Sequence, residues 1–169
     1  LKERMLPKMA GSEHKFAFAI TESNAGTNSF QMTTSATNEG GEYVISGEKA
    51  WITGADIADY ILLVCRTTPY EEVKDTNPKQ GGSLILVPTD LDGINMEPME
   101  LAVNKEVNQC IVHFDDVRVE ESLRIGEEGK GFDHVFDILN PERIVGAAWS
   151  AGLGEFVLDR GVEYAKERE

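Results

Sequence analysis

The pattern that decides the fold lies in residues 30–53, which read FQMTTSATNEGGEYVISGEKAWIT. Residues 30–38 alternate apolar or small side chains on one face with polar side chains on the other, the two-residue repeat of a half-buried strand. The EGGE sequence at 39–42 is a tight turn, after which the extended pattern resumes and is punctuated once at Ser46-Gly47. This stretch therefore predicts two consecutive hairpins.

The same strand signal recurs on both sides of this stretch. Residues 69–82 are polar and predict a solvated connection. Six or more short strands without helices between them favour an antiparallel barrel or sandwich. The additional strands are expected at 15–21, 60–67, 83–88, 93–97 and 110–114.

The periodicity changes to a helical one at Gly131, where apolar residues recur at i, i+3, i+4 and i+7. Asn140-Pro141 is expected to interrupt this helix, and a second helical stretch is expected from Glu142 to about Glu167. The predicted class is mainly β with flanking helices.

The composition excludes several partners. The chain has 169 residues with 16 basic and 30 acidic side chains, so its formal charge is −14. Nucleic acid is not expected as a partner, because such binding depends on many Lys and Arg contacts with phosphates. No apolar run approaches the roughly 20 residues of a transmembrane helix, so no transmembrane segment is expected.

Most familiar chemical motifs are missing from the sequence. The three histidines are scattered and no Cys/His spacing suits a metal, so no metal site is expected. Cys65 and Cys110 lie in apolar strand-like runs and are expected to be buried, reduced thiols, which is typical of an intracellular protein.

Two segments are better candidates for a site. In residues 16–29 an apolar strand runs into a loop of small, hydroxyl and amide side chains that can bring backbone N–H groups close to a ligand. In residues 47–55, Trp51 and Thr53 fall on the same face of a strand, where an indole can cover a flat ring and a hydroxyl can bond its edge. An ordinary turn and a core tryptophan are the alternatives.

Five segments stand out in order along the chain. They are AITESNAGT (19–27), YVISGEKAWIT (43–53), FDDVRV (114–119), GEEGKGF (126–132) and PER (141–143). Together they resemble the acyl-CoA dehydrogenase family, and the resemblance covers nearly the whole chain.

The resemblance implies a fragment of a longer, homotetrameric flavoprotein. Residues 1–14 would end an N-terminal helical domain, residues 15–128 would form the antiparallel middle β-barrel domain, and residues 129–169 would start a C-terminal helical bundle. The whole protein would lie in the cytoplasm, or in the mitochondrial matrix of a eukaryote. Alone, the chain is expected to bind FAD weakly or not at all and to show no turnover.

The resemblance also assigns the cofactor and its contacts. Thr21 would donate to the pyrimidine edge of the FAD ring, Trp51 would cover one face, and Thr53 would bond N5. The residues implied in FAD binding are Phe18, Ile20, Thr21, Thr27, Trp51, Ile52 and Thr53.

The implied reaction is α,β-dehydrogenation of an acyl-CoA to a trans-2-enoyl-CoA, with electrons passing to an electron-transfer flavoprotein. Substrate contacts would come from Thr27, Asn140, Glu142 and Arg143. The base is either Glu142, as in isovaleryl and long-chain types, or a Glu of the C-terminal bundle. An oxidase or flavin monooxygenase of the same fold, and a non-catalytic binding barrel, are the alternative functions.

The sequence also departs from the family pattern at positions that bear on acyl-chain choice and on the carrier. The departures are Ser23, Asn24, Thr27, Asn28, Gly54, Ala55, Asn104, Lys105, Val107 and Gln109.

Overall fold

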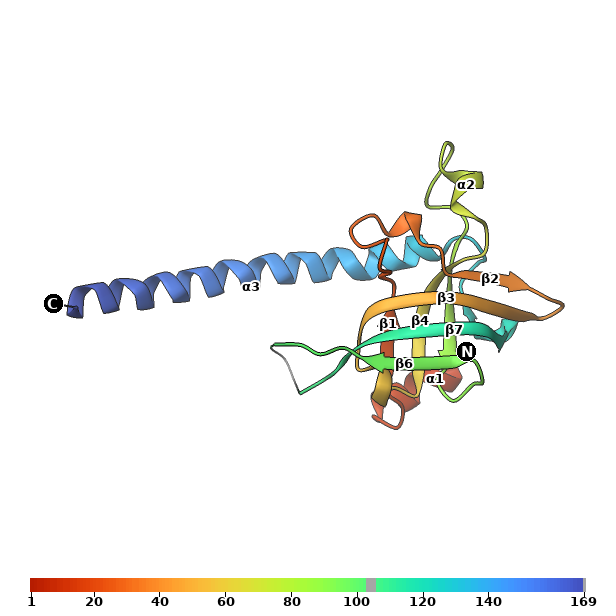
Figure 1. Cartoon of the computed structure of the whole chain (residues 1–169), viewed down its shortest axis with the longest axis horizontal. Coiled ribbons are helices and arrows are strands. Elements are labelled where there is room, and N and C mark those ends of the chain that lie inside the picture. The colour runs from red at the N-terminus through yellow and green to blue at the C-terminus, as the bar shows by residue number, and fades with distance from the viewer. Residues whose placement is uncertain (103–105, 169) are drawn as a thin grey trace. The chain divides into compact units, whose positions relative to one another are not determined.

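The computed structural model describes residues 1–102 and 106–168, which divide into two units, Leu1–Phe132 and Asp133–Glu169. The first unit is built on a sheet of eight strands (Figure 1). The strands are β1 (Phe16–Ala19), β2 (Ser35–Asn38), β3 (Glu42–Thr53), β4 (Tyr60–Arg66), β5 (Gly82–Pro88), β6 (Ile94–Pro98), β7 (Gln109–Glu120) and β8 (Arg124–Ile125).

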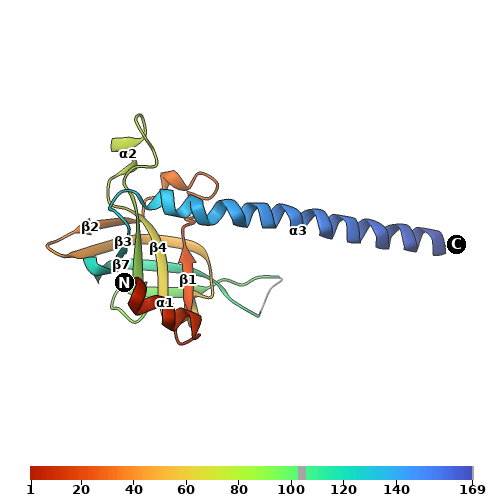
Figure 2. The same cartoon turned by 180° about the vertical axis from the view of Figure 1, so that it is seen from behind.

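Short helices connect or flank these strands. Helix α1 (Lys2–Ala10) precedes β1 in the chain (Figure 2), and α2 (Tyr70–Val73) falls within the connection between β4 and β5. Three 3-10 turns complete the unit: η1 (Ser29–Gln31), η2 (Ala55–Ile57) and η3 (Glu121–Leu123).

The strand order is β6-β7-β3-β2-β4-β5-β8, with β1 paired to β4. Most pairings are antiparallel, but β1 and β4 are parallel and β2 meets β4 in parallel through Ser35 and Arg66 alone. Among the described residues no pairing joins the two ends of this order, so the sheet is not closed into a barrel. The predicted class, mainly β with flanking helices, is confirmed.

The core follows from the alternation along the strands. Side chains that alternate inward from β3, β4, β5 and β7 form one buried cluster. Burying such aliphatic side chains contributes about 1.5 to 3 kcal/mol each. Its most deeply buried members include Tyr43, Ile45, Ile61, Leu63, Val87 and Val112.

The second predicted hairpin is wrong. Residues 42–53 form one strand that pairs with β7, and the pairing register shifts at two places, between Ile45 and Gly47 and between Lys49 and Ile52. Gly47 therefore marks a β-bulge, for which glycine is as typical as it is for a turn.

The predicted break at Asn140-Pro141 is also wrong. Helix α3 (Gly131–Glu167) runs through Pro141 without interruption, and from Asp133 onward it forms the second unit. Pro141 has no N–H to donate to the carbonyl of Asp137, which costs about 3 kcal/mol locally, but the other turns of a 37-residue helix keep their hydrogen bonds. Among the described residues, no helix has the length and apolar character needed to cross a membrane.

Candidate functional site

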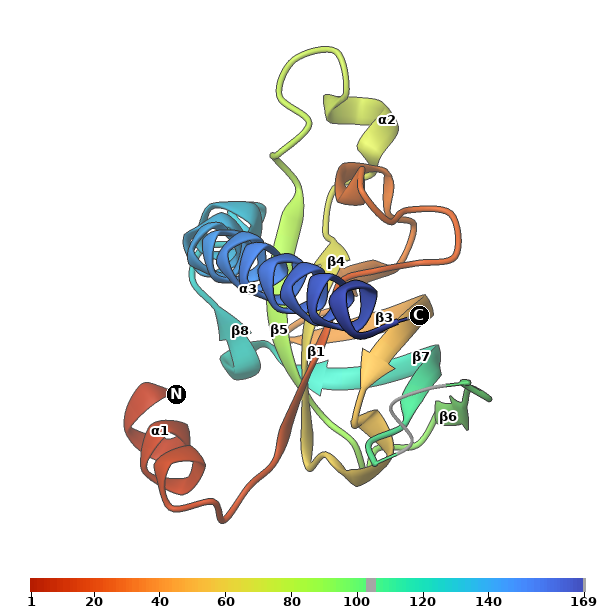
Figure 3. The same ribbon diagram turned by 90° about the vertical axis from the view of Figure 1, so that its left-hand side faces the viewer.

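The structure brings the two candidate segments together. The loop after β1, residues 20–34, lies above β3 (Figure 3). The Ala50 N–H donates to the Thr21 carbonyl at 2.9 Å, and the Ser23 hydroxyl donates to the Glu48 carboxylate at 2.8 Å. Segments separated by more than 20 residues in the sequence thus form one surface.

A buried ion pair lies beneath this surface. The Glu22 carboxylate accepts hydrogen bonds from the Thr33 N–H at 2.6 Å, the Thr33 hydroxyl at 2.9 Å and the Thr34 N–H at 2.9 Å. It also accepts one from the Lys49 ammonium at 2.9 Å. Glu22 is 4% exposed and Lys49 is fully buried, so the sheet and the loop are joined by charge as well as by backbone.

The surroundings of Glu22 keep it ionised. Burial alone would raise the pKa of its carboxyl, but the Lys49 charge and the hydrogen bonds from Thr33 and Thr34 outweigh burial and lower the pKa from 4.5 to about 2. Burial lowers the pKa of the Lys49 ammonium, and the Glu22 charge opposes this change. Nζ of Lys49 and Oε1 of Glu22 lie 2.9 Å apart, which is the geometry of a buried ion pair.

The bulge in β3 turns Trp51 out of the core. Lys49 and Ala50 are both buried, and the register shift that follows them leaves Trp51 with a φ of +62° and an exposed fraction of 54%. Ile52 is buried and Thr53 is exposed. Trp51 and Thr53 thus share the outward face, as the alternation predicts, and the core-tryptophan alternative is wrong.

Thr53 has a side-chain partner on the neighbouring strand. The Gln109 side-chain N–H donates to the Thr53 hydroxyl oxygen at 2.8 Å, and the Thr53 hydroxyl donates to the Gln109 side-chain oxygen at 3.0 Å. Gln109 is one of the residues at which the sequence departs from the family pattern. Two other departures, Asn104 and Lys105, lie outside the described residues.

The remaining predicted cofactor residues differ in their burial and in their hydrogen bonds. Phe18 and Ile20 are half-buried, and the Ile20 carbonyl accepts a hydrogen bond from Lys49 at 2.9 Å. Thr21 is half-buried, and no described residue accepts a hydrogen bond from its N–H or its hydroxyl. Thr27 is exposed on the loop. The structure therefore brings Ile20 and Thr21, but not Thr27, into direct contact with β3.

The predicted substrate residues lie in the second unit. Asn140, Glu142 and Arg143 are exposed on α3. The Arg143 guanidinium donates to the Asn140 side-chain oxygen at 3.5 Å and lies 5.9 Å from the Phe136 ring centroid. The structure describes this unit by itself, so the contribution of these residues to a site stays a prediction.

Sequence reasoning missed the buried charges. Glu22 and Lys49 both stand inside the quoted segments, but only their neighbours were singled out. The available signal was a lysine followed by the small residue Ala50 in a strand that is otherwise apolar on its inner side. A charged residue at an inward position requires a buried partner, and that requirement points to Glu22.

Arg66 is a second buried charge that the sequence did not reveal. It is 3% exposed and donates to the carbonyls of Phe30, Pro78 and Gln80. These contacts tie the end of the 20–34 loop to the connection before β5.

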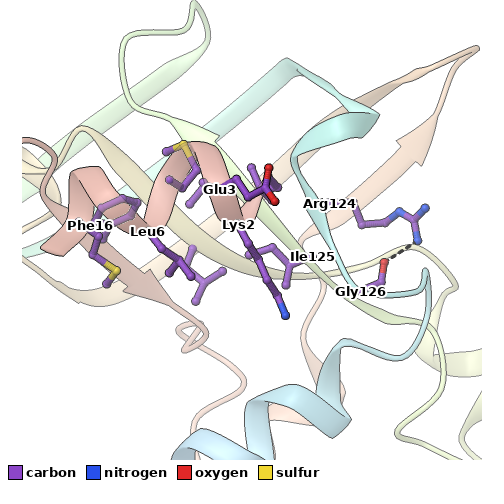
Figure 4. A pocket seen from close by; sticks show the side chains of 12 residues that line it. Lys2, Glu3, Leu6, Phe16, Arg124, Ile125 and Gly126 are labelled. Carbon is purple, nitrogen blue, oxygen red and sulfur yellow. Dashed lines mark hydrogen bonds between the residues drawn. The ribbon is translucent and has the colours of Figure 1, made fainter.

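A separate groove of about 660 Å³ lies between α1 and the sheet (Figure 4). Leu6, Phe16 and Ile125 are among its apolar lining residues, and at its edge Arg124 donates to the Gly126 carbonyl at 3.0 Å. None of the predicted site residues lines it, so we place the candidate site at Thr21, Trp51 and Thr53 rather than in this groove.

An exposed indole and an exposed hydroxyl on one face of a strand can cover a flat heteroaromatic ring and bond its edge. The fold is that of a mainly β domain followed by a helix. Residues 17–117 match the family model of the acyl-CoA dehydrogenase middle domain. The chain belongs to the acyl-CoA dehydrogenase family, a family of oxidoreductases.

Three relatives illustrate the match. The acyl-CoA dehydrogenase FadE12 of Mycobacterium bovis is 41% identical over 99% of the chain and 42% of its own length. A glutaryl-coenzyme A dehydrogenase in complex with glutaryl-CoA is 28% identical, with a TM-score of 0.82 over 99% of the chain and 41% of its own. A structure described as the electron transferring flavoprotein of Acidaminococcus fermentans is 28% identical, with a TM-score of 0.81 over 99% and 43%.

The chain therefore spans about 42% of the length of the relative with 41% identity. The activity, substrates and partners of the whole protein are matters for proposal.

Proposed function

We propose that the chain is the cofactor-binding middle part of an FAD-dependent acyl-CoA dehydrogenase that forms a trans-2-enoyl-CoA from an acyl-CoA. One observation carries the proposal: Trp51 has a positive φ and an exposed indole, and it directly follows Ala50, whose N–H donates to the carbonyl of Thr21. Backbone strain of this kind persists where the surrounding structure enforces it and is concentrated at functional sites.

The residues present fit FAD. A flavin ring needs a flat apolar cover, donors at its pyrimidine edge and a donor near N5. Trp51 supplies the cover, Thr21 the edge donors and Thr53 the hydroxyl, while Phe18, Ile20 and Ile52 supply the apolar surroundings. Thr27 would contact the phosphates and the thioester. When bound, FAD supplies the acceptor for the hydride that leaves the β carbon of the substrate.

The Thr21 N–H would stabilise negative charge at the pyrimidine edge of FAD, because a fixed backbone donor needs no reorganisation when charge develops. The hydroxyl of Thr53 is oriented by the side-chain amide of Gln109, which has its nitrogen 2.8 Å and its oxygen 3.0 Å from the hydroxyl oxygen. The Trp51 indole excludes water from one face, which strengthens both interactions.

The α proton of the thioester goes either to Glu142 or to a glutamate beyond the chain. Asn140 and Arg143 would line the same site. The glutaryl-CoA complex of the structural relative supports an acyl-CoA substrate, and the relative described as an electron transferring flavoprotein supports such a protein as the acceptor. We also propose a homotetramer and a cytoplasmic or mitochondrial-matrix location.

The test is anaerobic titration of the whole protein with acyl-CoAs of varied length and branching while flavin absorbance is followed. The proposal expects bleaching by at least one thioester. Rapid reoxidation by air would favour an oxidase instead, and a protein that no thioester bleaches would contradict the proposal. Full turnover by a Glu142→Gln variant would place the base elsewhere.

A further inference from the structure

The buried ion pair has a position that core packing does not explain. Glu22 directly follows Thr21, and Lys49 stands two residues before Trp51. The pair therefore joins the two segments at the point where each presents its ligand-facing group.

The ion pair also gathers both ends of the 20–34 loop onto β3. Lys49 donates to the Ile20 carbonyl at the start of the loop, and Glu22 accepts from Thr33 and Thr34 at its end. The buried ion pair thus holds the backbone at both ends of the loop by hydrogen bonds.

The bulge depends on the same contacts. Gly47 packs so closely on the loop that an added Cβ would lie 2.6 Å from the Thr34 Cα. The hydrogen bond from Lys49 to Glu22 holds the Lys49 side chain on the inner face of β3. This fixes which side chains of β3 face inward just before the register shift that turns Trp51 outward. Loop position and indole position are therefore set by one group of interactions.

Stability alone is a weak reason for such a pair. Replacing a buried ion pair by neutral side chains of similar volume is often neutral or stabilising, because two charges no longer have to be desolvated. The pair requires the desolvation of two charges and joins the segments that carry the Thr21 donor and the Trp51 indole. A role in positioning these two groups therefore fits it better than a role in stability.

We propose that Glu22 and Lys49 are positioning residues for the flavin site: their ion pair aligns the Thr21 donor and the Trp51 indole and so sets the redox potential of the bound flavin. The inference rests on the proposed function. Misalignment of the donor weakens binding of the reduced, negatively charged flavin more than binding of the oxidised flavin, so the midpoint potential falls.

The test compares the whole protein with the double variant Glu22→Gln, Lys49→Met, which removes both charges and keeps similar volume. We expect reduced flavin to lose at least tenfold more affinity than oxidised flavin. For a two-electron couple this corresponds to a potential lower by about 30 mV. Flavin dissociation constants, the midpoint potential and the melting temperature are measured together.

Tyr43→Phe is the matched control. It removes a buried hydroxyl that donates to Glu128 at 2.5 Å, on β3 but far along the strand from Lys49. We expect it to lower the melting temperature and leave the potential unchanged. The same drop in potential in this control would overturn the inference, because the effect would then be global.

Thr33→Val decides the matter if the double variant does not fold. It removes one hydrogen bond to Glu22 and keeps both charges. A smaller drop in potential is expected, and no drop overturns the inference. If thioesters bleach the flavin of the unmutated protein and the double variant has the same midpoint potential, this inference alone is overturned. If the unmutated protein binds no flavin, the proposed function is overturned as well.

Discussion

The ionisation of Glu22 couples the stability of the protein to pH. Its pKa is 4.5 in an unfolded chain and about 2 in the fold, because Lys49 and three hydrogen bonds outweigh the opposing effect of burial. A carboxylate with a lowered folded pKa contributes stability that is complete above pH 4.5 and is lost as the pH falls toward 2. A shift of this size corresponds to about 3 kcal/mol.

We therefore expect the free energy of unfolding to fall by up to about 3 kcal/mol between about pH 5 and about pH 2. Urea unfolding across this range measures the fall. The Glu22→Gln, Lys49→Met double variant is the control and should show a smaller fall. Equal falls in the two proteins would place the titrating groups elsewhere.

A substitution at Gly47 tests how closely the bulge in β3 packs against the 20–34 loop. Gly47→Ala puts a methyl group 2.6 Å from a backbone atom of Thr34 at a φ of +145°, so we expect a loss of about 2 to 4 kcal/mol. Gly40 also has a positive φ but nothing within 4 Å, so Gly40→Ala should cost only about 1 kcal/mol. Urea denaturation gives both values, and similar losses at the two sites would argue against the close contact.

Replacing Trp51 should change the stability of the protein little and its affinity for FAD strongly. Glycine relieves the strain at a φ of +62° and gives up only the buried part of a half-exposed indole, so Trp51→Gly should change the free energy of unfolding by no more than about 1 kcal/mol. FAD affinity of the whole protein should nevertheless fall at least about tenfold, the equivalent of 1.4 kcal/mol. Trp51→Phe is the control, and unchanged affinity in the glycine variant would remove Trp51 from the site.

At this scale the sequence predicted the face that Trp51 and Thr53 share, because that face depends only on alternation along one strand. It did not predict that Glu22 and Lys49 meet. That contact joins the loop to the strand across 27 residues and depends on the bulge, which local periodicity does not encode.

Among the elements, α3 offers a direct test of its continuity. Proline costs about 3 kcal/mol relative to alanine inside a helix. If the helix runs through residue 141, Pro141→Ala should raise stability by about 1 to 3 kcal/mol and increase helical circular dichroism. Gly146→Ala, with nothing within 4 Å of the added methyl, calibrates the scale at about 1 kcal/mol. No gain at Pro141 would support an interrupted helix.

Most strands were predictable as elements, but their partners were not. The β1–β4 pair is parallel and brings residue 16 beside residue 60, which a pattern of successive hairpins does not suggest. The turn and bulge at Gly40 and Gly47 use the same residue type, so composition alone could not separate a hairpin from a bent strand. Pro141 likewise favours a helix end without requiring one.

For the whole molecule, the main question is what this part of the family fold can do alone. Helix α3 exposes many large apolar side chains, among them Trp149, Leu153, Phe156 and Val157. Large exposed apolar surfaces of this kind mark contacts with other protein. We therefore expect that the chain by itself lacks part of the surface that encloses the ligand.

The corresponding prediction is that the 169-residue chain binds FAD at least about a hundredfold more weakly than the whole protein and shows no turnover with acyl-CoAs, a difference equivalent to about 3 kcal/mol. Equilibrium dialysis against FAD, with the whole protein measured beside it, tests this directly. A Trp51→Gly chain controls for nonspecific adsorption of flavin to the exposed apolar helix, because it keeps that helix and loses the indole. Tight, stoichiometric FAD on the parent chain but not on this control would mean that the Thr21–Trp51 surface is sufficient without any helical bundle.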